Sequence, residues 1–223
     1  MPVQSPAEEA LAIVEVLAER LPRHVDGVAA VGEMQRGGSA NWRQIEWFGF
    51  WFEYAGGSAL EGVLSARIPG PQFGNVVFDF QLEYTWDFKT HVTGSGTRAP
   101  LNDVAAIEQS AAAGGVGFVV LSGDAKYDHD GAFREWHVQE RGGRSRYSIE
   151  REREGRPSRL LKAAVTLTRI DAIFIASIAE LREAQDAGWM LPFSQGRNSN
   201  GLPRQLKYQI DLAKAPVIAS RQL

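Results

Sequence analysis

The sequence predicts an α/β (α+β) protein in which a mixed central β-sheet is flanked by helices. Segments 76–83 and 86–92 alternate apolar and polar residues, which is the two-residue period of a half-buried strand. Segment 116–121 is continuously apolar, as expected of a central strand covered on both faces. Segments whose apolar residues recur at helical spacing precede and separate these strands, so the sheet should carry helices.

The first helix is expected over 6–21, with Ser5 as its N-cap. The glycine-rich segment 32–40 is expected to be a loop. Segment 41–54 predicts a second helix, which is unusually aromatic and apolar on nearly every side, so it should be buried. The glycine pair 56–57 is expected to end it.

Three strands should follow, over 61–68, 76–83 and 86–92. Only Tyr84 and Thr85 separate the last two, which predicts a tight hairpin.

The rest of the chain predicts a helix over 101–113 and the buried strand 116–121. A strand over 164–176, a helix over 178–187 and a strand over 205–212 should follow. Because we find no linker and no internal repeat, we expect 1–223 to be a single domain.

Composition excludes several kinds of chemistry. The 223 residues contain no cysteine, which removes disulfides, thiolate nucleophiles and cysteine-bound metals and fits a cytoplasmic protein. No basic segment precedes an apolar run at the N-terminus, and no apolar run approaches about 20 residues, so we expect no signal peptide and no membrane association. The net charge of −3 does not itself favour a nucleic-acid partner, although binding depends on where charges lie.

The expected hairpin would bring Asp79, Asp87 and Lys89 onto one polar face. Two carboxylates and a lysine on a rigid sheet can hold a divalent metal and activate a water, which is the chemistry of phosphodiester hydrolysis. The alternative is a solvated hairpin face with an Asp–Lys ion pair. Glu46 and Glu53 lie along one stripe of the aromatic helix, and one of them, preferably Glu53, could face the same site.

Over residues 41–122 the expected order of elements is helix, strand, strand, strand, helix, strand. Asp79 lies on one strand, and the next strand carries an acidic-x-Lys triplet that begins at Asp87 and ends at Lys89. This arrangement resembles the PD-(D/E)XK nuclease superfamily. Within it, the chain resembles the type II restriction endonucleases. It departs from the usual pattern in that Phe78, rather than Pro, precedes Asp79, and the triplet begins with Asp where Glu is commoner.

The resemblance implies a restriction-endonuclease-like core that hydrolyses double-stranded DNA at a short specific sequence. It implies Mg²⁺ as the cofactor, bound by Asp79 and Asp87. Lys89 would act on the attacking water, and Glu46 or Glu53 would complete the catalytic set. A palindromic target would suit a homodimer.

Residues 123–223 would then supply DNA contacts beyond the core. The basic stretch 144–162 could follow the DNA backbone, or it could be an exposed helix with Glu–Arg pairs. The glycine-rich segment 195–201 could read bases through its Arg and Asn side chains, or it could be an ordinary turn cluster. The expected DNA-binding residues are Arg144, Arg146, Arg197, Asn198, Asn200, Arg204 and Lys207.

Other functions are compatible with the same sequence. A non-catalytic DNA-binding protein or a DNA repair nuclease could use the same core. A carbohydrate-active protein is suggested by the six tryptophans, but it would require the aromatic helix to be exposed. The acidic group Asp124, Asp128, His129 and Asp130 could bind a metal, but a solvated loop is the simpler interpretation.

Overall fold

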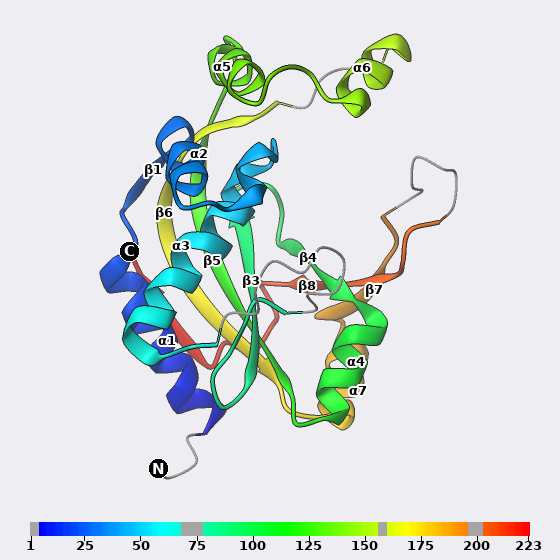
Figure 1. The fold of residues 1–223 in the computed structure, drawn as a ribbon. Helices are drawn as coiled ribbons and strands as arrows, with labels where there is room; N and C mark the ends of the chain where they lie inside the picture. Colours follow the sequence, from blue (N-terminus) through cyan, green and yellow to red (C-terminus); the bar gives the residue numbers. More distant parts are fainter. Residues whose placement is uncertain (1–4, 68–77, 156–159, 196–202) are drawn as a thin grey trace.

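Two β-sheets organise the fold (Figure 1), which a computed structural model describes for residues 5–67, 78–155, 160–195 and 203–223. The strands are β1 (His24–Asp26), β2 (Phe80–Gln81), β3 (Thr85–Val92), β4 (Arg98–Asp103), β5 (Val116–Tyr127), β6 (Lys162–Ile175), β7 (Met190–Phe193), β8 (Lys207–Asp211) and β9 (Ala219–Gln222). The larger sheet has the order β1–β6–β5–β3–β2, with β9 also paired to β6, and the smaller has the order β4–β8–β7. The larger sheet is mixed, because β3 and β5 are parallel while β5 and β6 are antiparallel.

Helices cover both faces of the larger sheet. They are α1 (Pro6–Arg20), α2 (Gly27–Arg36), the 3₁₀ helix η1 (Ala40–Arg43), α3 (Trp47–Leu64), α4 (Val104–Ala112), α5 (Ala132–Glu140), α6 (Arg146–Arg153) and α7 (Ile178–Asp186). Val119 and Leu121 of β5 pack with α1, α2 and α3, whereas Phe118 and Val120 pack with α4, α7 and the smaller sheet. This alternation confirms a mixed sheet flanked by helices.

Several expected elements are present. Helix α1 begins after Ser5, whose hydroxyl accepts a hydrogen bond from Glu8 N at 3.3 Å while the Glu8 carboxylate accepts one from Ser5 N at 2.8 Å. The hairpin forms with Phe80 opposite Trp86. The helix expected over 101–113 is α4, except that residues 101–103 belong to strand β4. The strands and helix expected over 116–121, 164–176 and 178–187 are β5, β6 and α7.

The aromatic helix differs most from expectation. Helix α3 begins at Trp47 rather than at residue 41, and it continues through the glycine pair 56–57 to Leu64. A Cβ at Gly56 would lie 3.1 Å from Phe88 Cζ, so this glycine lets the helix approach β3 closely instead of ending the helix.

The strand expected over 61–68 is therefore wrong through Leu64, and beyond it only an isolated bridge joins Arg67 to Gln81. The loop expected over 32–40 is also wrong through Arg36, because α2 continues across Gly32.

Two strand expectations need smaller corrections. Within 76–83 the structure has only β2 as strand, and residues 68–77 lie outside the described part. The strand expected over 205–212 is β8, and a further strand, β9, follows it along the edge of β6.

A buried carboxylate joins α1 to the hairpin. Glu9 is 2% exposed. It accepts hydrogen bonds from Glu83 N at 3.0 Å, Tyr84 N at 3.1 Å and Trp86 Nε1 at 2.6 Å. One side chain on α1 thus holds the turn that sets the position of β2 against β3.

We expect Glu9→Ala to lower the free energy of unfolding by about 2–4 kcal/mol, because three donors lose their acceptor in a buried place. The matched control is Glu15→Ala on the exposed side of the same helix, which should change it by less than about 0.5 kcal/mol. Equilibrium unfolding in urea, followed by circular dichroism, measures both. Equal effects of the two variants would contradict this role for Glu9.

Candidate active site

The predicted catalytic residues on β3 point away from the large aromatic core. Trp86 and Phe88 belong to the core beneath α1, α2 and α3. Asp87 and Lys89 alternate with them and therefore project to the opposite face of the strand.

Asp79 is fixed beside β3 by two hydrogen bonds. Its backbone N donates to Trp86 O at 3.1 Å, and its Oδ2 accepts from Phe88 N at 2.7 Å. In a longer β2, a backbone carbonyl would accept the hydrogen bond from Phe88 N, and here the Asp79 carboxylate accepts it instead. The hairpin therefore places Asp79 against the strand that carries Asp87 and Lys89, as the sequence predicts.

Asp87 is buried, with 2% of its surface exposed. Its Oδ2 forms an ion pair with Lys89 Nζ, and its Oδ1 accepts a hydrogen bond from Asn102 Nδ2 at 3.1 Å. Asn102 lies on β4, in the smaller sheet. Sequence reasoning did not select it, because no local pattern indicates that β4 approaches β3.

Glu53 lies on α3, which packs against the aromatic face of β3, and its charge interacts with those of Lys89, Asp87 and Asp79 across the strand. Burial raises the pKa of Glu53 from 4.5 to about 7, although the Lys89 ammonium acts to lower this pKa while the Asp87 carboxylate acts to raise it. Burial, with the negative charges of Asp87 and Glu53, raises the pKa of Asp79 from 3.8 to about 8. Three carboxyl groups therefore share one poorly solvated site, in which Asp79 is largely protonated and Glu53 about half protonated at pH 7.

Lys89 provides the positive charge of the cluster. Burial works against its charge, but the nearby Asp87, Asp79 and Glu53 carboxylates outweigh burial and raise the pKa of the Lys89 ammonium above its ordinary value. Lys89 therefore remains protonated between the carboxyl groups. Such strongly perturbed groups, gathered in one place, are typical of functional sites.

Glu46, the other predicted helix carboxylate, lies elsewhere. It is the residue before α3, and its Oε2 lies 3.6 Å from Lys162 Nζ on β6. Of the two alternatives, Glu53 therefore faces the cluster and Glu46 does not.

The donor set fits Mg²⁺ bound in an open manner. Across residues 5–67, 78–155, 160–195 and 203–223, no three His, Cys, Asp or Glu side chains form a ready-made metal cage. Mg²⁺ is commonly held by one or two carboxylates, with waters and substrate phosphate completing the shell. Asp79 and Asp87 supply such oxygens, and a divalent cation would relieve the repulsion that raises the pKa of Asp79.

Of the expected DNA-binding residues, the structure describes the side chains of Arg144, Arg204 and Lys207. Arg144 pairs with Glu152 at 2.7 Å, and Lys207 pairs with Asp103 at 3.3 Å. Arg204 is exposed. Arg197, Asn198 and Asn200 lie outside the described part of the structure, and so does the side chain of Arg146.

The acidic group at the end of β5 has a structural role. Asp128 accepts hydrogen bonds at 3.0 Å from both Phe133 N and Arg134 N, so it caps the start of α5. Asp130 accepts from Ala132 N at 3.2 Å. These bonds occupy the carboxylates in the turn and do not direct them to a common metal.

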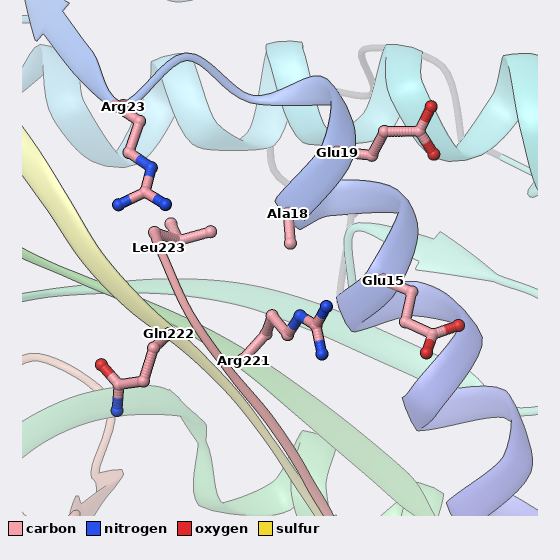
Figure 2. A pocket seen from close by; sticks show the side chains of 7 residues that line it. All are labelled: Glu15, Ala18, Glu19, Arg23, Arg221, Gln222 and Leu223. Atoms are coloured by element: carbon pink, nitrogen blue, oxygen red, sulfur yellow. The ribbon is translucent and has the colours of Figure 1, made fainter.

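A hollow between α1 and β9 has a volume of about 470 Å³. Figure 2 shows Arg23 and Arg221 pointing into it, with Glu15 and Glu19 on the side of α1. Its charged lining is mixed, with two arginines against two glutamates, so we assign no chemistry to it.

The aromatic helix is buried rather than exposed, with Trp47, Phe48, Trp51 and Phe52 all in the core. The carbohydrate-binding alternative, which needs these rings on the surface, therefore loses its support. Among the described residues, the helices are too short or too polar to cross a lipid bilayer. No protein-family model, curated protein or solved structure matches this chain.

Proposed function

We propose that this chain is a Mg²⁺-dependent endonuclease of the type II restriction kind, which hydrolyses phosphodiester bonds of double-stranded DNA at a short specific sequence. The observation that carries the proposal is the partly buried cluster of Glu53, Asp79, Asp87 and Lys89 around β3. Three carboxyl groups around a protonated lysine match the chemistry of metal-assisted phosphodiester hydrolysis.

The order of elements supports a restriction-endonuclease-like core. Helix α3 is followed by the β2–β3 hairpin, then by β4 of the smaller sheet, by α4 and by β5 parallel to β3. This arrangement places the helix carboxylate and the two strand carboxylates around the same strand.

Asp79 and Asp87 would hold Mg²⁺, which supplies charge neutralisation and polarisation of the scissile phosphate when bound. Lys89, held by Asp87, can donate a hydrogen bond to the attacking water or to a phosphate oxygen and offset the charge that develops there. Glu53, with a pKa of about 7, is suited to take a proton from that water near neutral pH.

The first test is digestion of unmethylated plasmid and phage DNA with Mg²⁺, beside reactions containing EDTA. We expect discrete fragments with Mg²⁺ and intact DNA with EDTA, and sequencing of the fragment ends then gives the site. A smear would favour a non-specific or repair nuclease. Binding without cleavage on several DNAs would contradict the proposal and favour a non-catalytic DNA-binding protein.

A restriction enzyme acting on a palindrome is expected to be a homodimer. Sedimentation of the protein with a short duplex carrying the site should then give two chains per duplex.

A further inference from the structure

A second candidate site lies away from the carboxylate cluster, between η1 and the helices α5 and α6. Figure 1 shows α5 and α6 beyond one end of the larger sheet, past the ends of β5 and β6. The cleft has a volume of about 570 Å³. Its charged lining residues are Arg43, Arg134, Arg141, Arg144, Arg151 and Glu152.

This lining carries five guanidinium groups against a single carboxylate, and that carboxylate, Glu152, is paired with Arg144 at 2.7 Å. The chain as a whole has a net charge of −3, so the positive charge is concentrated here against the overall balance. Guanidinium groups match the geometry of phosphate oxygens, to which they can donate two parallel hydrogen bonds.

Arg141 gives an independent indication of a missing anionic partner. Its Nε donates to Gly143 O at 2.9 Å, which fixes the plane of the guanidinium group. Its Nη2 is buried and makes no hydrogen bond within the described residues. A buried donor without an acceptor costs free energy, and a phosphate oxygen in the cleft would satisfy it.

We propose that this arginine cleft binds the phosphate backbone of the same duplex DNA that the carboxylate cluster acts on. Asp87 of the cluster lies opposite Phe118 near the start of β5, whereas α5 and α6 lie past the end of this strand. The cluster and the cleft therefore lie toward different ends of β5, and an extended polyanion such as duplex DNA is the kind of phosphate ligand that can contact both. This inference rests on the proposed nuclease function for its choice of DNA.

The test measures DNA binding rather than cleavage, with Ca²⁺ in place of Mg²⁺. We expect Arg141→Gln and Arg43→Gln each to weaken binding of a labelled duplex of about 30 base pairs several-fold and to reduce the salt slope of log K by about 1. Arg43 is exposed, so its variant keeps the test valid should Arg141→Gln fail to fold. The matched control is Arg182→Gln, an exposed arginine on α7 at the other end of the sheet, which should leave both quantities unchanged.

The outcomes separate the cleft from the nuclease function. If both cleft variants bind DNA with the same affinity and salt slope as the parental protein, the inference is overturned, even if the protein cleaves DNA. Reduced slopes in a protein that cleaves nothing would support the cleft and contradict the nuclease. A parallel titration with pyrophosphate distinguishes a free phosphate ligand: loss of pyrophosphate binding with unchanged DNA binding would overturn the assignment to DNA.

Discussion

Replacing Lys89 by Met or Asp87 by Asn is expected to lower the rate of Mg²⁺-dependent DNA cleavage by about 10³-fold or more. Lys89→Met removes the only positive charge in a cluster of three carboxyl groups while keeping the length of the side chain. Asp87→Asn removes both an oxygen proposed to bind the metal and the charged partner of Lys89 Nζ. The two residues act as a unit, so the double variant should lose little more than either single one.

Controls for these variants lie on β5. Lys126→Met and Asp124→Asn change exposed residues of the same two types and should cleave at the parental rate. DNA binding in Ca²⁺ should survive in all four variants, because the cluster is proposed to carry the chemistry rather than most of the phosphate contacts. If Lys89→Met or Asp87→Asn cleaves DNA at more than a tenth of the parental rate, the assignment of this cluster as the active site is contradicted.

The strands that carry the cluster could be predicted because their signal is local. Residues 86–92 alternate without interruption, and only a short turn separates them from Phe80. Those two features fix the hairpin, and the hairpin places Asp79 against Asp87 and Lys89.

The surroundings of the cluster depend on contacts that no local pattern encodes. Gly56 was expected to end a helix, because the sequence does not show that Phe88 packs against it. The choice between Glu46 and Glu53 depended on where α3 begins, and its start at Trp47 leaves Glu46 before the helix, near Lys162.

Partners distant along the chain were missed for the same reason. Glu9 and Asn102 reach the hairpin from α1 and β4, which are separated from it in sequence. The arginine cleft combines the predicted Arg144 with Arg43, which lies about a hundred residues earlier, so only the tertiary structure gathers them.

Asp79→Asn should have opposite effects on activity and on stability. Cleavage is expected to fall by about 10³-fold or more, because the variant loses a carboxylate of the proposed metal site. The metal-free protein should gain about 1–2 kcal/mol at pH 8, or about 2–8 °C in Tm, because a buried carboxyl no longer has to ionise beside Asp87 and Glu53. Asn retains an acceptor for Phe88 N, so the strand contact can survive.

The stability gain should depend on pH in a defined direction. The pKa of Asp79 rises from 3.8 to about 8 on folding, so between these values the folded state holds a proton that the unfolded state has released. Stability of the parent must then fall as pH rises from about 4 to about 8, and Glu53 contributes the same sign up to its pKa of about 7. The difference between Asp79→Asn and the parent should therefore be small at pH 4 and largest at pH 8.

Thermal melts in EDTA across this pH range measure the difference, and a second series with Mg²⁺ tests its cause. Mg²⁺ should raise the Tm of the parent at pH 8 and raise that of Asp79→Asn less, since bound metal favours the ionised carboxylate. Asp124→Asn, an exposed carboxylate on β5, should follow the parent at every pH. If Asp79→Asn is less stable than the parent at pH 8, the hydrogen bond from Phe88 N to Asp79 stabilises the fold by more than the buried charge of Asp79 destabilises it. A gain in the stability of Asp79→Asn that does not depend on Mg²⁺ would support the unfavourable burial of the carboxyl groups but would contradict metal binding in this cluster.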